Sequence, residues 1–241
     1  MDNLEFLRGI LLQTRYRQSP EAVAVRTAVL LAARSIPVLC SADTGEDPMD
    51  MPVGSVAYVL DGLRRRGAAE PAVLNYPPAL RPYLHRNVWL STLGQERGSD
   101  SWVKGAGHDK PFTPGLATRP DLQALDPDCQ VLASEPVRWL CEWRCYVAGG
   151  RLLWRERYDP DGADDTPDLS PSAIDEMIAA YESDGMSPAG YALDVGVLSD
   201  GRTALVEVND GYALGYYGRV SPARACSYLD LLAARYAQML F

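Results

Sequence analysis

Hydrophobic and polar positions are patterned differently in the first hundred residues and in the rest of the chain. Ser19-Pro20-Glu21 predicts a helix start, with Ser as the N-cap and Pro at the first helical position, and the Ala- and Leu-rich run to Arg34 continues that helix. Short apolar runs predict strands at 36–40, 55–59 and 72–76, with a short helix at 61–66. Strands and helices in alternation indicate a small α/β unit.

Longer β-rich runs dominate the second part of the chain. They predict strands at 102–105, 130–133, 138–147 and 152–158, a hairpin at 191–209, and helices at 172–182 and 222–241. The acidic segment 159–170 contains Pro and Gly and is expected to be a surface loop. We therefore expect an α+β protein with an N-terminal α/β region, residues 1–95, and a larger second region, residues 96–241.

The hairpin at 191–209 carries the most informative chemistry. Asp-Gly at its centre is a strong turn signal, and the turn is expected to pair Leu198 with Thr203. Counting back along both strands then places Asp194 opposite Glu207. Period-2 alternation puts Asn209 on the same face as Glu207, with Ala204, Val206 and Val208 on the other face.

Two acids that face each other need a reason, because like charges directly opposite in a sheet are destabilising. Mg²⁺ usually lies between one or two carboxylates and substrate phosphates, so Asp194, Glu207 and Asn209 form a candidate magnesium site. The alternative is a solvated acidic hairpin whose carboxylates never meet.

A second hairpin carries positive charge. Gly149-Gly150 predicts a two-residue turn that pairs Ala148 with Arg151. On this count Arg144 faces Arg155 and Glu142 faces Arg157, with all four side chains on one face. Glu142 and Arg157 would form a cross-strand ion pair, whereas two facing arginines favour a bound anion, because the guanidinium fork suits phosphate oxygens. The alternative is two arginines that lean apart into water.

The segment 102–115 adds Lys104 and Lys110 among small residues. Gly105 and Gly107 allow the backbone to approach a ligand closely and leave N–H groups free for an anion. The segment lacks the spacing of a P-loop, and a loop lysine by itself is usually solvated. Together with the two hairpins, however, these lysines predict a polyphosphate site with a metal on one side and fixed cations on the other.

Composition narrows the classes of function. The chain has 241 residues, of which 47% are hydrophobic and 23% charged, as is typical of globular proteins. Its net charge of −9 argues against a nucleic-acid partner, which would require a basic surface. Five cysteines without a CxxC pair indicate neither a disulfide framework nor a zinc site, and two histidines are too few for a His-based metal site. The first residues lack a signal-peptide pattern and no apolar run approaches a membrane span, so we expect a cytoplasmic enzyme without a membrane partner.

Taken in order, these segments resemble the ATP-grasp enzymes, and among them the small proteins of the arginine-to-lysine (R-to-K) clade. The residues that carry the resemblance are Val103-Lys104, Asp109-Lys-Pro-Phe-Thr113, Ser134-Glu-Pro-Val137, Glu142-Trp-Arg-Cys-Tyr-Val147, Leu193-Asp-Val-Gly196, Val206-Glu-Val-Asn-Asp210 and Gly215-Tyr-Tyr-Gly218. The first hundred residues match only loosely. The resemblance implies an ATP-grasp fold, in which two α+β subdomains hold ATP between them, preceded by a small α/β pre-grasp unit.

The resemblance also implies roles for single residues. Lys104 is similar to the strand lysine at the α- and β-phosphates, and Arg144 to the arginine near the γ-phosphate. The residues that it assigns to the nucleotide are Lys104, Glu135, Pro136, Val137, Glu142 and Arg144. Those that it assigns to magnesium are Asp194, Glu207 and Asn209, and those at the reacting groups are Lys110, Arg144 and Arg155. The family commonly has Gly after Phe-Thr where this chain has Pro114, which leaves the shape of the phosphate-covering loop open.

The function implied is that of an ATP- and Mg²⁺-dependent carboxylate–amine ligase that acts through an acyl phosphate and releases ADP and phosphate. Its substrates would be small-molecule or peptide carboxylates and amines, and either 105–115 or 159–170 would supply a lid. The alternatives are an ATP-dependent phosphotransferase and a non-catalytic nucleotide-binding module. A nucleic-acid ligase fits less well, because no KxDG-type sequence is present. The sequence identifies neither the acyl donor nor the acceptor, nor the oligomeric state.

Overall fold

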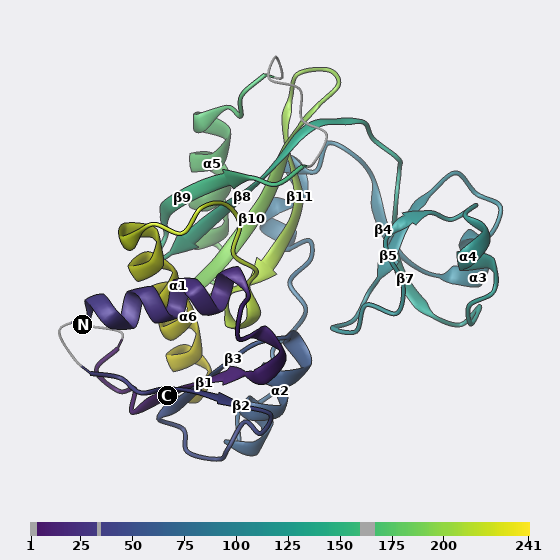
Figure 1. Ribbon diagram of the computed structural model, residues 1–241. Helices are drawn as coiled ribbons and strands as arrows, with labels where there is room; N and C mark the ends of the chain where they lie inside the picture. Colours follow the sequence, from purple (N-terminus) through teal and green to yellow (C-terminus); the bar gives the residue numbers. More distant parts are fainter. Residues whose placement is uncertain (1–3, 33–34, 160–166) are drawn as a thin grey trace.

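The computed structural model describes residues 4–32, 35–159 and 167–241. Over these residues the strands form three sheets, with the orders β2-β1-β3, β11-β10-β8-β9 and β4-β7-β5-β6. Figure 1 shows the four-stranded sheet of β8–β11 in the middle of the molecule, the N-terminal sheet below it, and the third sheet in a lobe that stands apart. The α+β class expected from the sequence is confirmed. None of the helices in the described part of the chain has the length and apolar character of a membrane span.

The N-terminal unit is a parallel sheet with helical connections. It consists of β1 (Gly9–Gln13), η1 (Thr14–Tyr16), α1 (Pro20–Leu31), β2 (Val38–Ser41), β3 (Asp50–Val53) and α2 (Val56–Arg65). The predicted cap is present, because the Ser19 side chain accepts a hydrogen bond from the Ala22 amide. The strand predicted at 55–59 is wrong: Ser55 caps α2 by accepting from the Tyr58 amide, and the apolar run is the buried face of that helix.

Two other differences concern strands of this region. β1 was not predicted, since its residues are all or nearly all buried and show no alternation, as in other parallel strands. The strand predicted at 72–76 is absent, and only an isolated bridge joins Asn75 to Val208. This bridge nevertheless brings the linker, residues 66–87 between α2 and β4, against the edge of the large sheet.

The large sheet consists of β8 (Trp139–Ala148), β9 (Arg151–Arg157), β10 (Gly190–Leu198) and β11 (Thr203–Asp210), all antiparallel to their neighbours. One face packs against α5 (Pro171–Ser183), in a core that includes Cys145 and Leu193. The other face packs against α1 and α6 (Pro222–Leu240), in a core that includes Tyr146 and Ala192. Arg144 and Asp194 pair two positions further along from Tyr146 and Ala192, so their side chains continue the α6 face of the sheet.

The third sheet forms a small lobe with its own core, which includes Leu93, Val103 and Leu122. Its elements are β4 (Val88–Thr92), α3 (Leu93–Glu96), β5 (Trp102–Gly105), β6 (Gly115–Leu116), α4 (Pro120–Gln123) and β7 (Gln130–Ser134). Because β4 pairs with β7, the boundary expected after residue 95 falls inside this lobe. The chain enters the lobe after η2 (Pro78–Tyr83) and leaves it through residues 135–138, which lead directly into β8.

Bulges change the register of both predicted hairpins. In β10–β11, Val197 pairs with Thr203, so the expected pairing of Leu198 was wrong by one residue, but a bulge restores Asp194 opposite Glu207 as predicted. In β8–β9, Ala148 pairs with Arg151 as predicted, and a bulge after Val147 then shifts the rest of the ladder. The predicted face-to-face arginines and the Glu142–Arg157 pair are therefore wrong: Arg144 pairs with Glu156, and Arg157 pairs with Trp143.

Candidate functional site

The three candidate magnesium ligands converge on one point. The Asn209 Nδ2 atom donates to Asp194 Oδ2 at 3.0 Å and to Glu207 Oε1 at 3.1 Å. One amide group therefore bridges the two carboxylates that the strand register places opposite each other. The alternative in which these acids lean apart into water does not describe this hairpin.

Two cations neutralise the acids. Arg144 donates from Nε and Nη2 to the two oxygens of Asp194, both at 2.7 Å, and the two residues are only 7% and 2% exposed. Burial opposes the charge on Arg144, but the carboxylate of Asp194 outweighs burial and raises the pKa of the guanidinium. Lys104, from β5 in the small lobe, donates to Glu207, so this ion pair crosses from one lobe to the other. Burial alone would raise the pKa of Glu207, but the nearby Lys104 and Lys110 lower it below its ordinary value.

A third carboxylate and two aromatic rings surround Arg144. Glu142 lies two residues before it on β8 and accepts a hydrogen bond from the Tyr158 hydroxyl at 3.0 Å. Burial, together with the nearby Asp194 and other acids, raises the pKa of Glu142. Tyr158 stacks on Tyr217, and the guanidinium of Arg144 lies 4.8 Å from the centre of the Tyr217 ring. The two rings therefore hold Arg144 in place, and Glu142 contributes by binding the Tyr158 hydroxyl.

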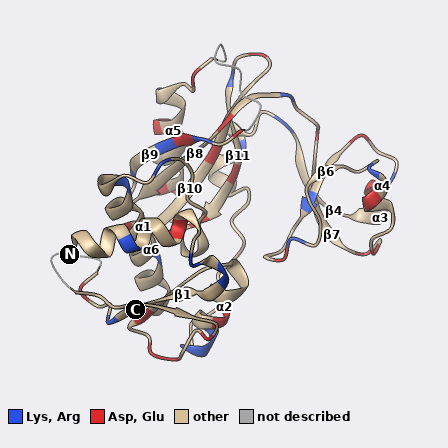
Figure 2. Ribbon diagram, viewed as in Figure 1, with Lys and Arg blue, Asp and Glu red and all other residues tan. Residues whose placement is uncertain are grey.

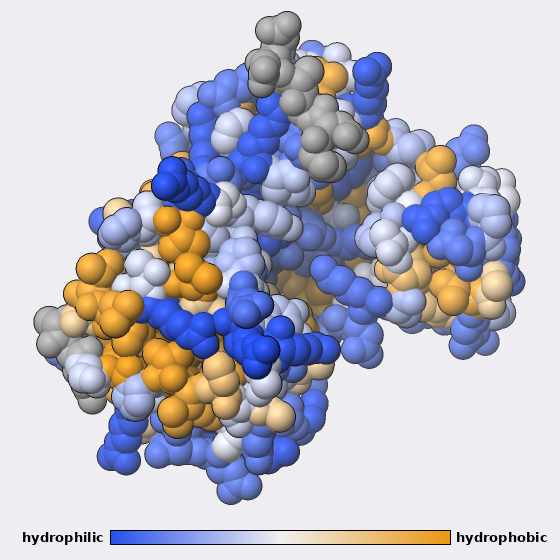
Figure 3. Space-filling model, in the orientation of Figure 1, coloured by the Kyte–Doolittle hydropathy of each residue, from blue (hydrophilic) through white to orange (hydrophobic). Residues whose placement is uncertain are grey.

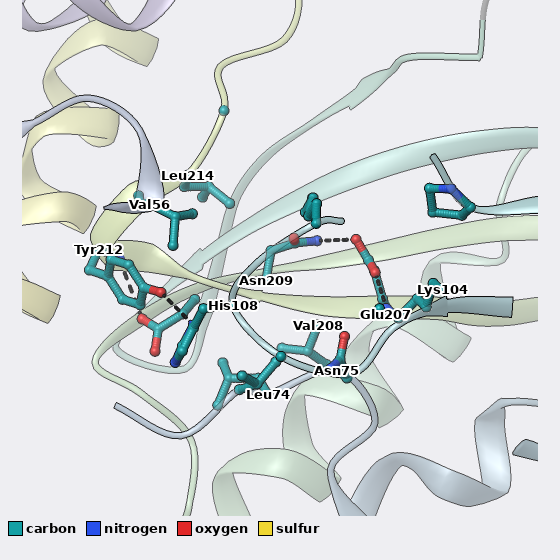
Figure 4. A pocket seen from close by; sticks show the side chains of 18 of the residues that line it. Val56, Leu74, Asn75, Lys104, His108, Glu207, Val208, Asn209, Tyr212 and Leu214 are labelled. Carbon is teal, nitrogen blue, oxygen red and sulfur yellow. Dashed lines mark hydrogen bonds and ion pairs between the residues drawn. The ribbon is translucent and has the colours of Figure 1, made fainter. Parts of the chain in front are cut away.

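Cavities open on both sides of this charged cluster, in the hollow between the small lobe and the rest of the molecule (Figure 3). A cavity of about 310 Å³ is lined by Glu135 and Val137, together with Trp102 and Trp139. Glu135 and Val137 belong to the hinge, the segment 135–138 that joins the small lobe to the large sheet. A second cavity of about 380 Å³ is lined at one end by Arg144, Lys110 and Asn209 and at the other by apolar groups, including Val56 and Leu214. Lys104, Pro114 and Glu207 line both cavities. Figure 4 shows Asn209, Glu207 and Lys104 in a row on one side of the second cavity and the hydrogen-bonded pair His108 and Tyr212 on the other.

The three hinge residues that the resemblance assigns to the nucleotide, Glu135, Pro136 and Val137, lie between β7 and β8. Both carboxylate oxygens of Glu135 accept hydrogen bonds from Asn87, one from its backbone amide at 3.0 Å and one from its side chain at 2.7 Å. These hydrogen bonds lower the pKa of Glu135. Pro136 is exposed, and Val137 faces the first cavity. The hinge is thus fixed to the segment through which the chain enters the small lobe.

The two remaining cations have different positions. Lys110 lines the second cavity and forms no ion pair with any residue that the structure describes. Arg155 pairs across the strands with Cys145, whose side chain belongs to the core on the α5 face, so it points away from the face that carries Arg144. It donates to Asp168 at 2.9 Å. The expected role of Arg155 at the reacting groups is therefore not supported by its position, because a bulge has moved it to the wrong face.

Two carboxylates and one amide meet the requirements of a magnesium ion. Across the described ranges no cluster of three or more His, Cys, Asp and Glu side chains is placed to hold a metal. The amide can present oxygen after a rotation, however, and Mg²⁺ commonly takes one or two carboxylates with phosphate and water. A cavity with tryptophan and backbone at the hinge is next to Lys104 and Arg144, which suits a base followed by a polyphosphate. These residues fit both a metal and a nucleotide.

Several residues near the site had no predicted role. Tyr158 contacts Arg144, while Tyr76 lies under both Lys104 and Arg86. Isolated tyrosines and a lone arginine carry no spacing signal, so only the fold reveals them. The sequence offered Tyr212, Tyr216 and Tyr217 either as lining of a substrate pocket or as a loop that packs on the last helix. The tyrosines after the acidic motif divide between two roles: Tyr212 and Tyr217 line the second cavity, whereas Tyr216 packs edge-on against Tyr228 of α6.

Comparison with known proteins identifies the fold and the family. No curated protein matches the sequence. Among solved structures, a RimK domain ATP-grasp protein from Sphaerobacter thermophilus is similar, with a TM-score of 0.57 and 17% identity over 96% of this chain and 98% of that one. The ATP-grasp ligase PsnB, complexed with a minimal precursor, has a TM-score of 0.53 and 14% identity over 95% and 99% of the two chains. The D-alanine–D-alanine ligase of Bacillus anthracis has a TM-score of 0.53 and 13% identity over 97% and 96%.

The similarity to these structures shows that the fold is the ATP-grasp fold. The profile of a family described as the ATP-grasp domain, R-to-K clade family 2, matches residues 83–226. This match includes the small lobe, the hinge and the acidic hairpin. The chain belongs to the R-to-K clade of ATP-grasp proteins, family 2.

Proposed function

We propose that this protein is an ATP- and Mg²⁺-dependent carboxylate–amine ligase that forms an amide bond through an acyl phosphate and releases ADP and phosphate. The observation that carries the proposal is the cluster of two acids and two cations, one pair buried and one partly buried, between two cavities. The first cavity would hold the base, the cluster the phosphates and metal, and the second cavity the acyl donor and the amine.

The charges of the cluster suit an exchange of partners. Figure 2 shows acidic and basic residues interleaved on the strands of the large sheet. Asp194 and Glu207 carry two negative charges, and Arg144 and Lys104 carry two positive charges. A bound metal would take over the acids, and the phosphates would take over the cations, so each side chain keeps an opposite charge. Bound magnesium would neutralise charge on the β- and γ-phosphate oxygens during the transfer.

The reaction itself needs positioning more than a protein nucleophile. A carboxylate oxygen of the donor attacks the γ-phosphorus, the bond to the β–γ bridging oxygen breaks, and ADP leaves. The amine nitrogen then attacks the acyl carbon, the bond to the phosphate oxygen breaks, and the amine loses a proton as phosphate departs. Lys110 and Arg144 face the cavity where this donor would lie, and their positive charges draw an anionic carboxylate toward an anionic phosphate.

A peptide is the substrate class that the neighbours favour. PsnB has been solved with a precursor peptide and AMPPNP, and the macrocyclase MdnC from Microcystis aeruginosa with its precursor peptide MdnA. These are properties of those proteins, and they support testing peptides here beside free amino acids. The apolar end of the second cavity would receive the uncharged part of either substrate.

The experiment is incubation with ATP, Mg²⁺ and a panel of amino acids and peptides, with ADP release and new masses as the readouts. We expect ADP, free phosphate and an amide product. A phosphorylated acceptor without an amide would establish a phosphotransferase instead, and no substrate-dependent ADP release would leave a nucleotide-binding module. Glu207→Gln should lower turnover by about 100-fold or more. The matched control is Asp200→Asn, an exposed acid of the same hairpin that should retain full activity.

A further inference from the structure

Arg86, in the segment that enters the small lobe, reaches the large sheet at the bulge beside the acids. Its Nη1 atom donates to the Leu205 carbonyl at 2.7 Å, and its Nη2 atom donates to the Val206 carbonyl at 2.9 Å. The guanidinium lies over the rings of Tyr76 and Trp139, at 5.7 and 5.3 Å from their centres. No ion pair of Arg86 occurs within the described residues, so the fork is directed at backbone rather than at an acid.

These two carbonyls belong to the residues that form the bulge. Val195 pairs with Leu205 and Asp194 pairs with Glu207, so Val206 is the extra residue of β11. In a regular strand successive carbonyls point to opposite sides, whereas two successive carbonyls at a bulge can point outward together. β11 is an edge strand, so outward carbonyls have no strand partner, and Arg86 supplies one fork of donors for both.

The bulge decides where Glu207 points. Val206 and Glu207 both line the first cavity, although strict alternation would place them on opposite faces. The predicted face for Val206 was wrong for this reason. A slip of one residue turns a strand's side chains to the other face, so loss of the bulge would turn Glu207 away from Asp194 and Lys104.

The linker on either side of this contact is held in uncommon backbone conformations. Among the described residues, Asn75 and His85 are the non-glycine residues with positive φ, at +38° and +50°. The Asn75 carbonyl accepts a hydrogen bond from the Val208 amide at 2.8 Å, and His85 precedes Arg86 directly. Conformations of this kind persist where surrounding contacts over-determine them. The linker therefore binds the backbone of β11 on both sides of Glu207, through Arg86 before it and Asn75 after it.

We infer that Arg86 is a positioning residue for nucleotide and metal: it holds the β11 bulge and thereby aims Glu207 into the magnesium site. The inference rests on the proposed function only through the role of Glu207 as a metal ligand. Arg86 acts on Glu207 through the backbone of β11, by its hydrogen bonds to the Leu205 and Val206 carbonyls.

The test is calorimetric titration of the intact protein with ADP in the presence of Mg²⁺. Arg86→Met and Arg86→Lys should each weaken binding by about 10- to 100-fold, the usual effect of removing a group that orients a metal ligand. Lys fails as well, because a single ammonium cannot replace the fork across two carbonyls. Arg151→Met, which removes an exposed arginine from the opposite edge strand of the same sheet, should bind as the wild type does.

The double variant Arg86→Lys/Glu207→Gln separates positioning from general damage. If Arg86 acts through Glu207, the double variant binds no more weakly than Glu207→Gln alone. Independent effects that multiply, or unchanged binding by both Arg86 variants, would overturn the inference while leaving the proposed function intact. Wild-type binding by Glu207→Gln would instead remove the magnesium assignment and the proposed function with it. If Arg86→Met does not fold, the ADP affinities of Arg86→Lys and of the double variant are sufficient to test the inference.

Discussion

Two regions of the molecule bury a carboxylate, and they treat it in opposite ways. In the small lobe, Glu96 is 7% exposed and accepts hydrogen bonds from the Trp89 indole at 2.9 Å, from Ser101 at 2.7 Å and from Ser99 at 3.2 Å. In the large sheet, Asp194 is 2% exposed and is matched by the charged guanidinium of Arg144. The first acid has only neutral partners and the second has a cation.

The difference separates a structural acid from a candidate functional one. The donors around Glu96 come from β4 and from the segment that precedes β5. Its carboxylate oxygens therefore join elements of one lobe and do not face a cavity of the candidate site. Asp194 is joined through Asn209 to Glu207, which lines both cavities, and the partners of the two acids are cations that suit phosphate equally well. Burial alone therefore does not mark a site; the kind of partner and the open space beside it do.

The largest effect on stability is expected from Arg144→Met. Removal of one partner of a buried ion pair leaves an uncompensated charge, so we expect a loss of about 3–5 kcal/mol in the free energy of unfolding, measured by urea denaturation. Arg144→Met/Asp194→Asn should recover much of this loss, because the orphaned carboxylate is gone. If Arg144→Met were as stable as the wild type, Asp194 would have another counter-ion.

A smaller effect is expected from Glu96→Gln. One carboxylate oxygen becomes an NH₂ group that faces a donor, which costs about 1–3 kcal/mol. Urea denaturation should report this loss, while Mg²⁺–ADP affinity of the folded protein remains that of the wild type. A selective loss of nucleotide affinity would show that Glu96 has a role beyond the structure of its lobe.

The smallest effect is a contrast in pH dependence. Hydrogen bonds outweigh burial and lower the pKa of Glu96, so its contribution to stability is present above the pKa of the unfolded chain and is lost as the pH falls through the folded value. Burial raises the pKa of Glu142, so its contribution is present at low pH and is lost as the pH rises through the folded value.

Thermal unfolding between pH 3 and pH 8, at about one-unit steps, should therefore show opposite trends for two variants. The penalty of Glu96→Gln should shrink at acid pH, and any gain from Glu142→Gln should grow as the pH rises. Parallel curves for both variants would contradict these assignments.

The sequence predicted which residues form the site better than it predicted how the strands that carry them pair. Asp194 opposite Glu207 followed from the Asp-Gly turn, but only because the bulge at Val206 compensates for a turn one residue longer than expected. The same counting failed for Arg144 and Arg155, where a bulge in β9 has no compensating shift. Bulges depend on tertiary contacts such as that of Arg86 with Leu205, which are 119 residues apart, and local patterning contains no record of them.

The helices and strands, too, were predicted well only where the local sequence carried a signal. Ser19 and the Gly-containing turns that follow β8 and β10 carry local signals, and these elements were predicted nearly in full. The apolar run at 55–59 fits a strand and a helix equally well, and packing of Tyr58 and Leu63 in the core selected the helix. The loop expected at 159–170 lies largely outside the described residues, so its expected lid role stays a prediction.

The most direct measurement is a crystal structure with ADP and Mn²⁺ in place of Mg²⁺, with anomalous diffraction to locate the metal. We predict a peak within about 2.0–2.6 Å of oxygens from Asp194 and Glu207, with Lys104 and Arg144 turned toward phosphate. A metal bound elsewhere, or a nucleotide that leaves both ion pairs of the cluster intact, would contradict the account.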